Sequence, residues 1–158
     1  MRVSVADLAR EAGIAERTFY RWFDTKEQAL RPVFDWGTDQ YAVMLADASA
    51  SIVESAEAAF ERVLWGDLEP RTRGLFPLVF AEASAQSVFF LAVHDGEHRI
   101  VAPLAERLGT GPGDLTPRAV AAAVSASLRI ALEDMARTGE DPRPLHARTL
   151  RAFGLGAL

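Results

Sequence analysis

Apolar residues recur at helical spacing along almost the whole chain. In the segment VADLAREA, Val5, Leu8 and Ala12 stand three and four residues apart, as they would on one face of a helix. No segment alternates apolar and polar residues with the β-branched enrichment that is typical of strands. The pattern therefore predicts an all-α protein.

Glycine, proline and capping residues divide this pattern into separate helices. Ser4, with an acid three residues later, predicts a capped start for the first helix, and Gly13 ends it. A second short helix is expected over residues 16–23. A longer helix is expected from Lys26 into the forties, after a second capping signature that begins at Thr25. Further helices are expected at about 52–66, 71–85, 87–108, 117–138 and 143–155.

The first two predicted helices follow the helix-turn-helix plan. Ala9 supplies the small side chain that two closely crossing helices need, and Gly13 tolerates a positive φ in the turn. In the second helix Phe19 and Phe23 lie four residues apart on one face, which we expect to be buried. Arg17 then points the opposite way.

The outward face of the second helix carries groups that suit DNA. Guanidinium, hydroxyl, phenol and indole groups can contact base edges and phosphates in a major groove. The start of the following helix also favours a phosphate, because its free N–H groups lie at the positive end of the helix dipole. An ordinary amphipathic helix with a solvated basic face is the alternative. The candidate DNA-binding residues are Arg17, Thr18, Tyr20, Arg21, Trp22 and, on the following helix, Lys26.

Composition is that of a globular protein without disulfides. Hydrophobic residues make up 49% of the 158 residues, which is enough for a core, and cysteine is absent. No segment reaches the ~18 uncharged apolar residues of a membrane span. We therefore expect a cytoplasmic protein without a membrane partner.

Charge differs between the two parts of the chain. Residues 1–31 carry six basic and five acidic side chains, whereas the remainder carries eleven basic and seventeen acidic ones. The contrast favours an N-terminal part that can approach phosphate. The formal net charge of −5 argues against a protein that coats nucleic acid along its whole surface.

The segment VSVADLAREAGIAERTFYRWFDTKEQAL, residues 3–30, resembles the DNA-binding segment of the TetR family of bacterial transcriptional repressors. The resemblance is carried by AGI at 12–14, FYRWF at 19–23 and KEQAL at 26–30. It implies a homodimeric, all-helical repressor that binds a palindromic double-stranded DNA operator and responds to a small-molecule inducer. It also implies DNA contacts for Ser4, Thr18, Tyr20, Arg21, Trp22 and Lys26.

Three features depart from the family pattern. Ala15 stands where a capping serine or threonine is usual, which removes a cap worth about 1 kcal/mol. Trp22 stands where histidine is frequent. The family has a further helix before this motif, whereas only three residues precede the cap of the first helix at Ser4 here. We therefore expect a DNA-binding domain over 1–31 that is truncated at its N-terminus, and a ligand-binding and dimerisation domain over 32–158.

The second domain is rich in large aromatic residues. For any one of them the simplest interpretation is a place in the core. Together they favour an apolar cavity within the helical bundle for a mainly apolar inducer, aromatic or acyl. The candidate lining residues are Trp36, Phe60, Phe80, Phe89, Phe90 and His94.

The segment HDGEH, residues 94–98, matches a reversed zinc-protease signature. It supports an alternative function, a small metal-dependent hydrolase built on His94, Glu97 and His98. A catalytic zinc site needs a third protein ligand, and Gly96 is expected to interrupt the helix that holds the pair. The chain also shows no nucleophile–base pair. We therefore expect no enzyme activity, no cofactor and no metal.

The last two predicted helices carry more apolar surface than one subunit is expected to bury. Small residues on nearly every face permit close helix approach, and a two-fold four-helix bundle would cover the surplus. Packing within one subunit is the alternative. A ligand-binding helical dimer with a non-functional DNA-binding head is a further alternative for the whole protein. The candidate dimerisation residues are Leu128, Leu132, Met135, Leu150 and Phe153.

Overall fold

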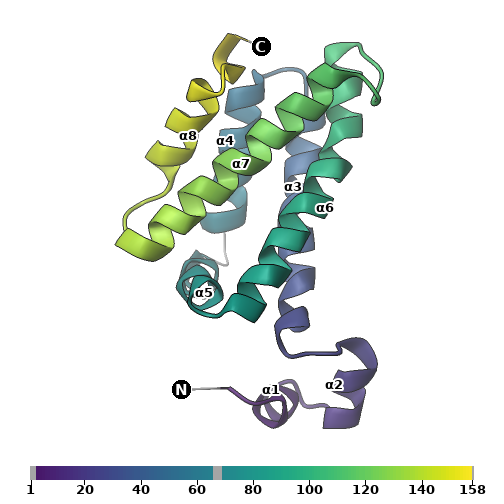
Figure 1. The fold of residues 1–158 in the computed structure, drawn as a ribbon, viewed down its shortest axis with the longest axis vertical. Helices are drawn as coiled ribbons and strands as arrows, with labels where there is room; N and C mark the ends of the chain where they lie inside the picture. The colour runs from purple at the N-terminus through teal and green to yellow at the C-terminus, as the bar shows by residue number, and fades with distance from the viewer. Residues whose placement is uncertain (1–2, 66–68, 158) are drawn as a thin grey trace.

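The computed structural model describes the backbone of residues 3–65 and 69–157, and the side chains of these residues except 69–73. The described residues form eight α-helices, two short 3-10 helices and no strand, which confirms the all-α prediction (Figure 1). In chain order the helices are α1 (Val5–Glu11), α2 (Glu16–Trp22), η1 (Glu27–Leu30), α3 (Arg31–Ala46), α4 (Ile52–Trp65), α5 (Glu69–Ala81), α6 (Ala83–Leu108), α7 (Leu115–Thr138), α8 (Arg143–Ala152) and η2 (Leu155–Ala157).

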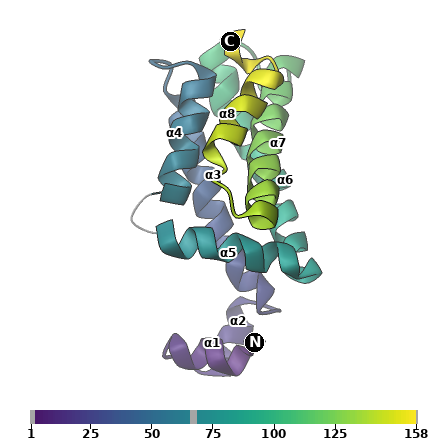
Figure 2. The ribbon, with the colours of Figure 1, turned by 90° about the vertical axis from the view of Figure 1, so that its left-hand side faces the viewer.

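The helices form a small head and a larger bundle. Figure 1 shows α1 and α2 together at one end of the molecule, with η1 and α3 leading from them into the bundle. The C-terminus lies at the opposite end. Figure 2, turned by a quarter, shows α5 lying across the end of the bundle that faces the head. The head is therefore joined to the bundle mainly through η1, which packs on α3 and α6.

The core of the bundle is built around α3, α6 and α7. Helix α3 packs most extensively on α6, and α6 on α7, while α4 and α8 pack on each other and on this centre. Leu45, Leu64 and Leu104 are completely buried within it. Burial of an aliphatic side chain of this size contributes about 1.5–3 kcal/mol to folding.

The start of α1 is held by the predicted cap. The Ser4 hydroxyl oxygen accepts from the Asp7 backbone N–H, and the Asp7 carboxylate accepts from the Ser4 backbone N–H, both at 3.1 Å. Hydrogen bonds from the Ser4 hydroxyl and N–H lower the pKa of Asp7 to about 2. Gly13 has a φ of 67° in the turn, and Ala15 gives α2 no side-chain cap, both as predicted.

The long helix after the head begins later than predicted. Residues 27–30 form the 3-10 helix η1, and α3 follows with Pro32 in its first turn. Proline has no N–H and is tolerated only at such a position, which explains the displaced start. The Thr25 hydroxyl accepts from the Gln28 backbone N–H at 3.3 Å. The Gln28 side chain, however, accepts from the Asp24 N–H, so the second capping signature forms only in part.

The boundary between α5 and α6 lies at Glu82, four residues before the predicted break at 86. The chain turns by 112° there, which places α5 across the bundle. No glycine or proline marks the position, so the sequence carries no local sign of it. The helices predicted at 52–66, 117–138 and 143–155 agree with α4, α7 and α8 to within three residues.

Gly96 does not interrupt its helix, in contrast to the prediction. Helix α6 runs without a break from Ala83 to Leu108, and Gly96 is buried within it. A Cβ at this position would lie 2.6 Å from Thr38 Oγ1 and 2.9 Å from Thr38 Cγ2. The glycine therefore permits the close approach of α6 to α3, and its role is tertiary rather than local.

Helix α7 is long and apolar enough to pass a membrane-span test that tolerates a few charged residues, although it has no run of ~18 uncharged apolar residues. Its most apolar 18-residue window has a mean hydropathy of 1.2, and the bent α5–α6 pair passes the same test as one unit. In α7, 44% of that window is buried inside the protein. A core helix of a water-soluble protein passes this test equally well.

Candidate DNA-binding face and ligand cavity

One face of α2 anchors the head. Phe19 is buried, and its ring centroid lies 5.3 Å from that of Phe23. Ala9 of α1 is also buried, and its carbonyl accepts from the Ile14 backbone N–H at 2.9 Å. These contacts fix the angle between α1 and α2. The predicted burial is confirmed for Phe19, whereas Phe23 is half-buried, because α2 ends at Trp22 and Phe23 has an extended backbone.

The opposite face of α2 is open to solvent. Tyr20 and Trp22 are 53% and 56% exposed, and Arg17 and Arg21 are exposed beside them. The Arg21 guanidinium lies 5.8 Å from the centroid of the Trp22 ring, within the range of a cation–π contact. Thr18 is half-buried at the edge of this face. Two exposed aromatic rings on a seven-residue helix are costly unless a partner covers them.

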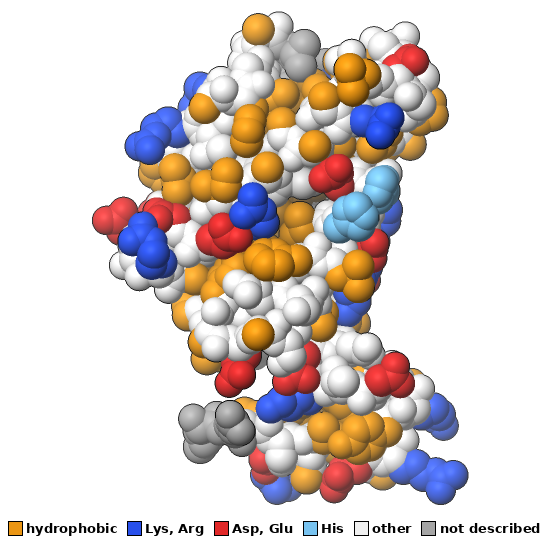
Figure 3. Space-filling model, in the orientation of Figure 1, with side chains coloured by type: hydrophobic (Ala, Val, Ile, Leu, Met, Phe, Trp, Pro, Cys, Tyr) orange, Lys and Arg blue, Asp and Glu red, His pale blue; other side chains and the backbone are white. Residues whose placement is uncertain are grey.

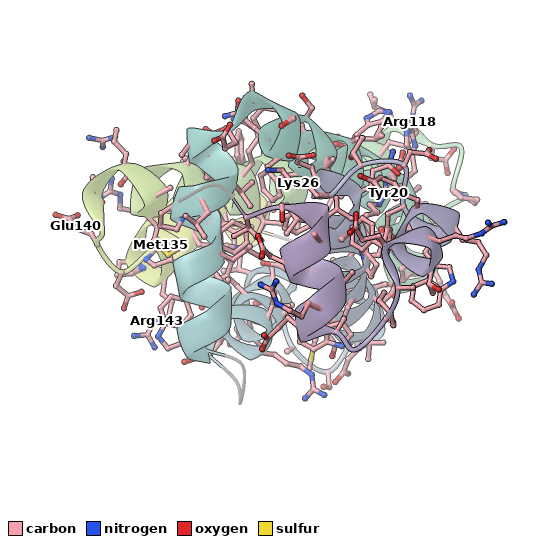
Figure 4. The ribbon with its side chains drawn as sticks, turned by 90° about the horizontal axis from the view of Figure 1, so that it is seen from below. Tyr20, Lys26, Arg118, Met135, Glu140 and Arg143 are labelled. Atoms are coloured by element: carbon pink, nitrogen blue, oxygen red, sulfur yellow. The ribbon has the colours of Figure 1, made fainter. Side chains whose placement is uncertain are left out.

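Lys26 and Ser4 lie at the edge of the same head. The Lys26 ammonium donates to the Val3 carbonyl at 3.1 Å, which ties η1 to the segment before α1. Its side chain is still 39% exposed, so it can reach a further acceptor. The Ser4 hydroxyl donates to Asp7 at 2.6 Å. Figure 4, viewed from the head, shows Tyr20 and Lys26 on the elements nearest the viewer.

A chain of ion pairs links α3 to α6 where the head meets the bundle. The Arg31 guanidinium contacts Asp35 at 2.9 Å and Asp95 at 2.6 Å, and Arg99 contacts Asp35 at 2.6 Å and Asp39 at 3.3 Å. The hydrogen bond from Arg31 lowers the pKa of Asp95, and the same bond raises the pKa of Arg31. This network was not predicted from the sequence. Its only trace is the four-residue spacing within each helix.

The bundle contains an apolar cavity of about 80 Å³ between α3, α4, α5, α6 and α7. Two of the predicted lining residues, Trp36 and Phe89, border it. Phe34, Tyr41 and Phe76 also line it and were not predicted from the sequence. Phe34 and Tyr41 are two helical turns apart, so they lie on the same face of α3. This spacing was the signal in the sequence that could have identified them as lining residues.

Three of the other predicted lining residues lie outside the cavity. Phe80 packs against Phe89 at 5.4 Å between ring centroids and so forms a second layer behind the wall. Phe90 and His94 line a separate surface hollow beside Arg129. Phe90 and His94 follow Phe89 by one and five residues, which turns their side chains by about 100° and about 140° around the helix axis, toward the outer side of α6.

Phe60 is likewise absent from the cavity wall. It is buried between α4 and α8, where its ring centroid lies 4.1 Å from that of His146. Phe60 and His146 border a hollow between these two helices. The prediction for Phe60 as a cavity residue is therefore wrong for the cavity that the bundle contains.

The cavity is smaller than a typical ligand site. Drug-sized ligands occupy pockets of roughly 300–1,000 Å³, and a dry engineered cavity of about 150 Å³ admits benzene. A space of about 80 Å³ holds only a few non-hydrogen atoms. A larger ligand that is fully enclosed must therefore push the surrounding helices apart.

The metal-hydrolase alternative rests on a pair of histidines on the outer side of α6. The ring centroids of His94 and His98 lie 4.8 Å apart at the surface, where Figure 3 shows histidine side chains side by side. Within the part of the chain that the structure describes, no group of three or more histidine, aspartate or glutamate side chains could hold a metal ion. Glu97 lies beside Arg129 in the surface hollow, which disfavours a cation there.

Most of the predicted dimerisation residues are core residues. Leu132, Met135 and Leu150 are buried within the subunit at 1%, 5% and 0% exposure, so they offer no surface to a second copy. These residues are buried instead by the packing of α7 on α6 and α8. Leu128 is half-buried and lines the cavity, whereas Phe153 is exposed after the end of α8.

Two family models match the chain, and they cover the head and the bundle after α3. Residues 1–31 match the model described as bacterial regulatory proteins, tetR family. Residues 48–157 match the model described as the MftR C-terminal domain. No curated protein matches the chain.

Proposed function

The chain belongs to the TetR family of bacterial regulatory proteins, and on that premise we propose that it is a ligand-responsive repressor that binds a palindromic operator as a homodimer. Residues 1–31 would bind DNA, and residues 32–158 would bind the ligand and the second subunit. The protein would act in the cytoplasm, where bacterial DNA lies. We assign no catalytic role to it.

The exposed face of α2 is the observation that carries the proposal. It presents two guanidinium groups, a phenol and an indole to solvent, while Phe19 anchors the opposite face of the helix. Guanidinium forks pair with guanine edges or phosphates, and rings of this size gain from burial in a groove. Lys26 beside this face would contact a phosphate and set the register of the head on the duplex.

The outer side of α7 and α8 is the candidate dimer surface. The outward stripe of α7 carries Ala119, Ala122, Ala126 and Ile130, which are half-buried or exposed in one subunit. Small residues let a second helix approach closely, and Phe153 at the end of α8 would add an aromatic anchor. In a two-fold contact each of these residues acts twice. This surface replaces the buried leucines of the sequence prediction.

The small cavity supplies a physical route from ligand to DNA. Because a ligand larger than a few atoms must widen the space between α3, α6 and α7 to be enclosed there, it binds better to a conformation in which these helices are further apart. Helix α3 continues through η1 into the head, so such a change moves the α2 helices of the dimer relative to each other. The operator affinity then falls by the ratio of ligand affinities for the two conformations.

Selection of binding sites from random double-stranded DNA tests the proposal. We expect an enriched palindrome whose half-sites are about one helical turn, or a multiple of it, apart. On the enriched sequence, Arg21→Ala should weaken binding by about tenfold or more. Lys26→Ala should weaken it and reduce the slope of log affinity against log salt by about 0.9. Arg118→Ala, at the far side of the bundle, is the control and should change neither.

The outcome separates the proposal from its alternatives. Absence of any enriched sequence, with apolar compounds still raising the melting temperature, would favour a ligand-binding dimer with a non-functional head. Unchanged affinity in both head variants would remove α2 from the interface even if DNA binds.

A further inference from the structure

The described residues that line the cavity include hydroxyl groups but no charged side chain. Most of the wall is aliphatic or aromatic, and the hydroxyls belong to Thr38, Tyr41 and Ser125. Thr38 is already occupied, because its hydroxyl donates to the Phe34 carbonyl at 3.2 Å. The polar groups left for recognition are the hydroxyls of Tyr41 and Ser125 and the indole N–H of Trp36.

The Ser125 hydroxyl is free to bind a ligand. The residue is 7% exposed and borders the cavity from α7. Among the hydrogen bonds of the described residues, none involves its Oγ, although a helical serine commonly donates to the carbonyl one turn before it. Because Ser125 borders the cavity, its hydroxyl can donate to a ligand oxygen that lies there.

The second hydroxyl belongs to a buried pair. Tyr41 Oη lies 3.0 Å from His146 Nε2, and both side chains are almost fully buried. Burial raises the pKa of Tyr41 well above its usual value and lowers the pKa of His146 to about 4, so both groups are uncharged at neutral pH. The two uncharged groups then carry two polar hydrogens, one on the phenol and one on the imidazole, but they form only one hydrogen bond with each other.

One of the two hydrogens is therefore always without an acceptor. If Tyr41 donates to Nε2, the hydrogen of His146 sits on Nδ1, which has no hydrogen-bond partner. If Nε2–H donates to Tyr41 instead, the phenolic hydrogen is the free one. Only Tyr41 of these two residues borders the cavity, whereas His146 borders the hollow between α4 and α8. A ligand in the cavity can satisfy the pair only in the second arrangement.

We propose that the ligand of this cavity is an apolar molecule with one uncharged oxygen acceptor, such as a carbonyl or ether, which accepts from the Tyr41 hydroxyl. Tyr41 in turn accepts from His146 Nε2–H, and Ser125 donates to the same oxygen or to a second one. A carboxylate is excluded from the buried part, because no described cation borders the cavity to offset its desolvation. The inference rests on the ligand pocket of the proposed function and names the chemistry of its ligand.

Three probes with similar shape test the inference: acetophenone, which has the carbonyl, cumene, which lacks it, and benzoate, which is charged. Their affinities are measured by titration calorimetry on the whole chain. Tyr41→Phe should weaken acetophenone binding about tenfold and leave cumene binding unchanged, because only acetophenone loses a hydrogen bond. Tyr20→Phe removes the same hydroxyl from the head and should alter neither affinity. Benzoate should not bind at the concentrations that saturate with acetophenone.

Imidazole nitrogen resonances give a second readout that a purely structural role of Tyr41 would not produce. Acetophenone should shift His146 toward the tautomer with hydrogen on Nε2, and cumene should not. Equal effects of Tyr41→Phe on acetophenone and cumene, or benzoate binding as tight as acetophenone, would overturn the inference alone. If cumene and acetophenone both fail to bind, the ligand cavity of the proposed function falls with it.

Discussion

Substitution of Gly96 by alanine tests whether the contact between α3 and α6 is as close as the structure has it. The new Cβ would lie 2.6 and 2.9 Å from two side-chain atoms of Thr38. Thr38 is β-branched and donates to the Phe34 carbonyl, so it cannot rotate away freely. Either the helices separate or the hydrogen bond is lost. Overpacking of this kind costs about 1–3 kcal/mol.

The matched control is the same substitution at Gly74 in α5. A Cβ there would meet no atom within 4 Å. Alanine is favoured over glycine in a helix by about 1 kcal/mol, and both variants receive this gain. Gly74→Ala should therefore be up to about 1 kcal/mol more stable than the natural protein. Gly96→Ala should fall below Gly74→Ala by about 1–3 kcal/mol in urea unfolding, equivalent to roughly 2–12 °C in melting temperature for a chain of this size.

A double-variant cycle assigns the cost to Thr38. Thr38→Ala removes both close atoms, so it should restore most of the stability lost in Gly96→Ala. Thr38→Val keeps two branches of the same shape and should restore none. Equal stabilities of Gly96→Ala and Gly74→Ala would refute the argument, as would restoration by valine as good as that by alanine.

Three further outcomes are expected. Burial lowers the pKa of His146 from 6.5 to about 4, so the unfolded chain binds more protons between these pH values, and stability falls as pH falls through this window. His146→Leu should remove up to about 3 kcal/mol of that loss, measured as the difference in unfolding free energy between pH 7 and pH 4. Phe153→Asp should shift sedimentation from dimer to monomer, whereas Arg118→Asp should not, and a natural chain that sediments as a monomer at tens of micromolar would contradict the dimer. Ser4→Ala should cost about 1 kcal/mol in unfolding, and no loss would show that the cap of α1 is not coupled to global stability.

Features set by neighbours in the chain were predictable from sequence. The cap at Ser4, the turn at Gly13 and the buried position of Phe19 each depend on residues within one or two helical turns. The exposed face of α2 follows from the same periodicity. The matched family model over residues 1–31 agrees with this part of the analysis.

Features set by packing between distant elements were not predictable. Glycine commonly breaks a helix, which is why a break was predicted at Gly96. Only the position of Thr38 on the facing helix shows that Gly96 instead permits close packing. The burial of Leu132 and Leu150 depends on how much surface one subunit covers, which helical spacing does not reveal. Similarly, Phe60 is apolar and well placed for a cavity on its own helix, but α8 packs over it.

The size of the cavity also bears on how fast the protein can respond. If the space must grow before a ligand enters, the rate of association is limited at high ligand concentration by the opening of the bundle and not by diffusion. Observed association rates would then level off at one value for ligands of different size and chemistry, because the opening step belongs to the protein. Motions of packed helices occur in microseconds to milliseconds, so such an opening step would set the upper limit of the association rate on that timescale.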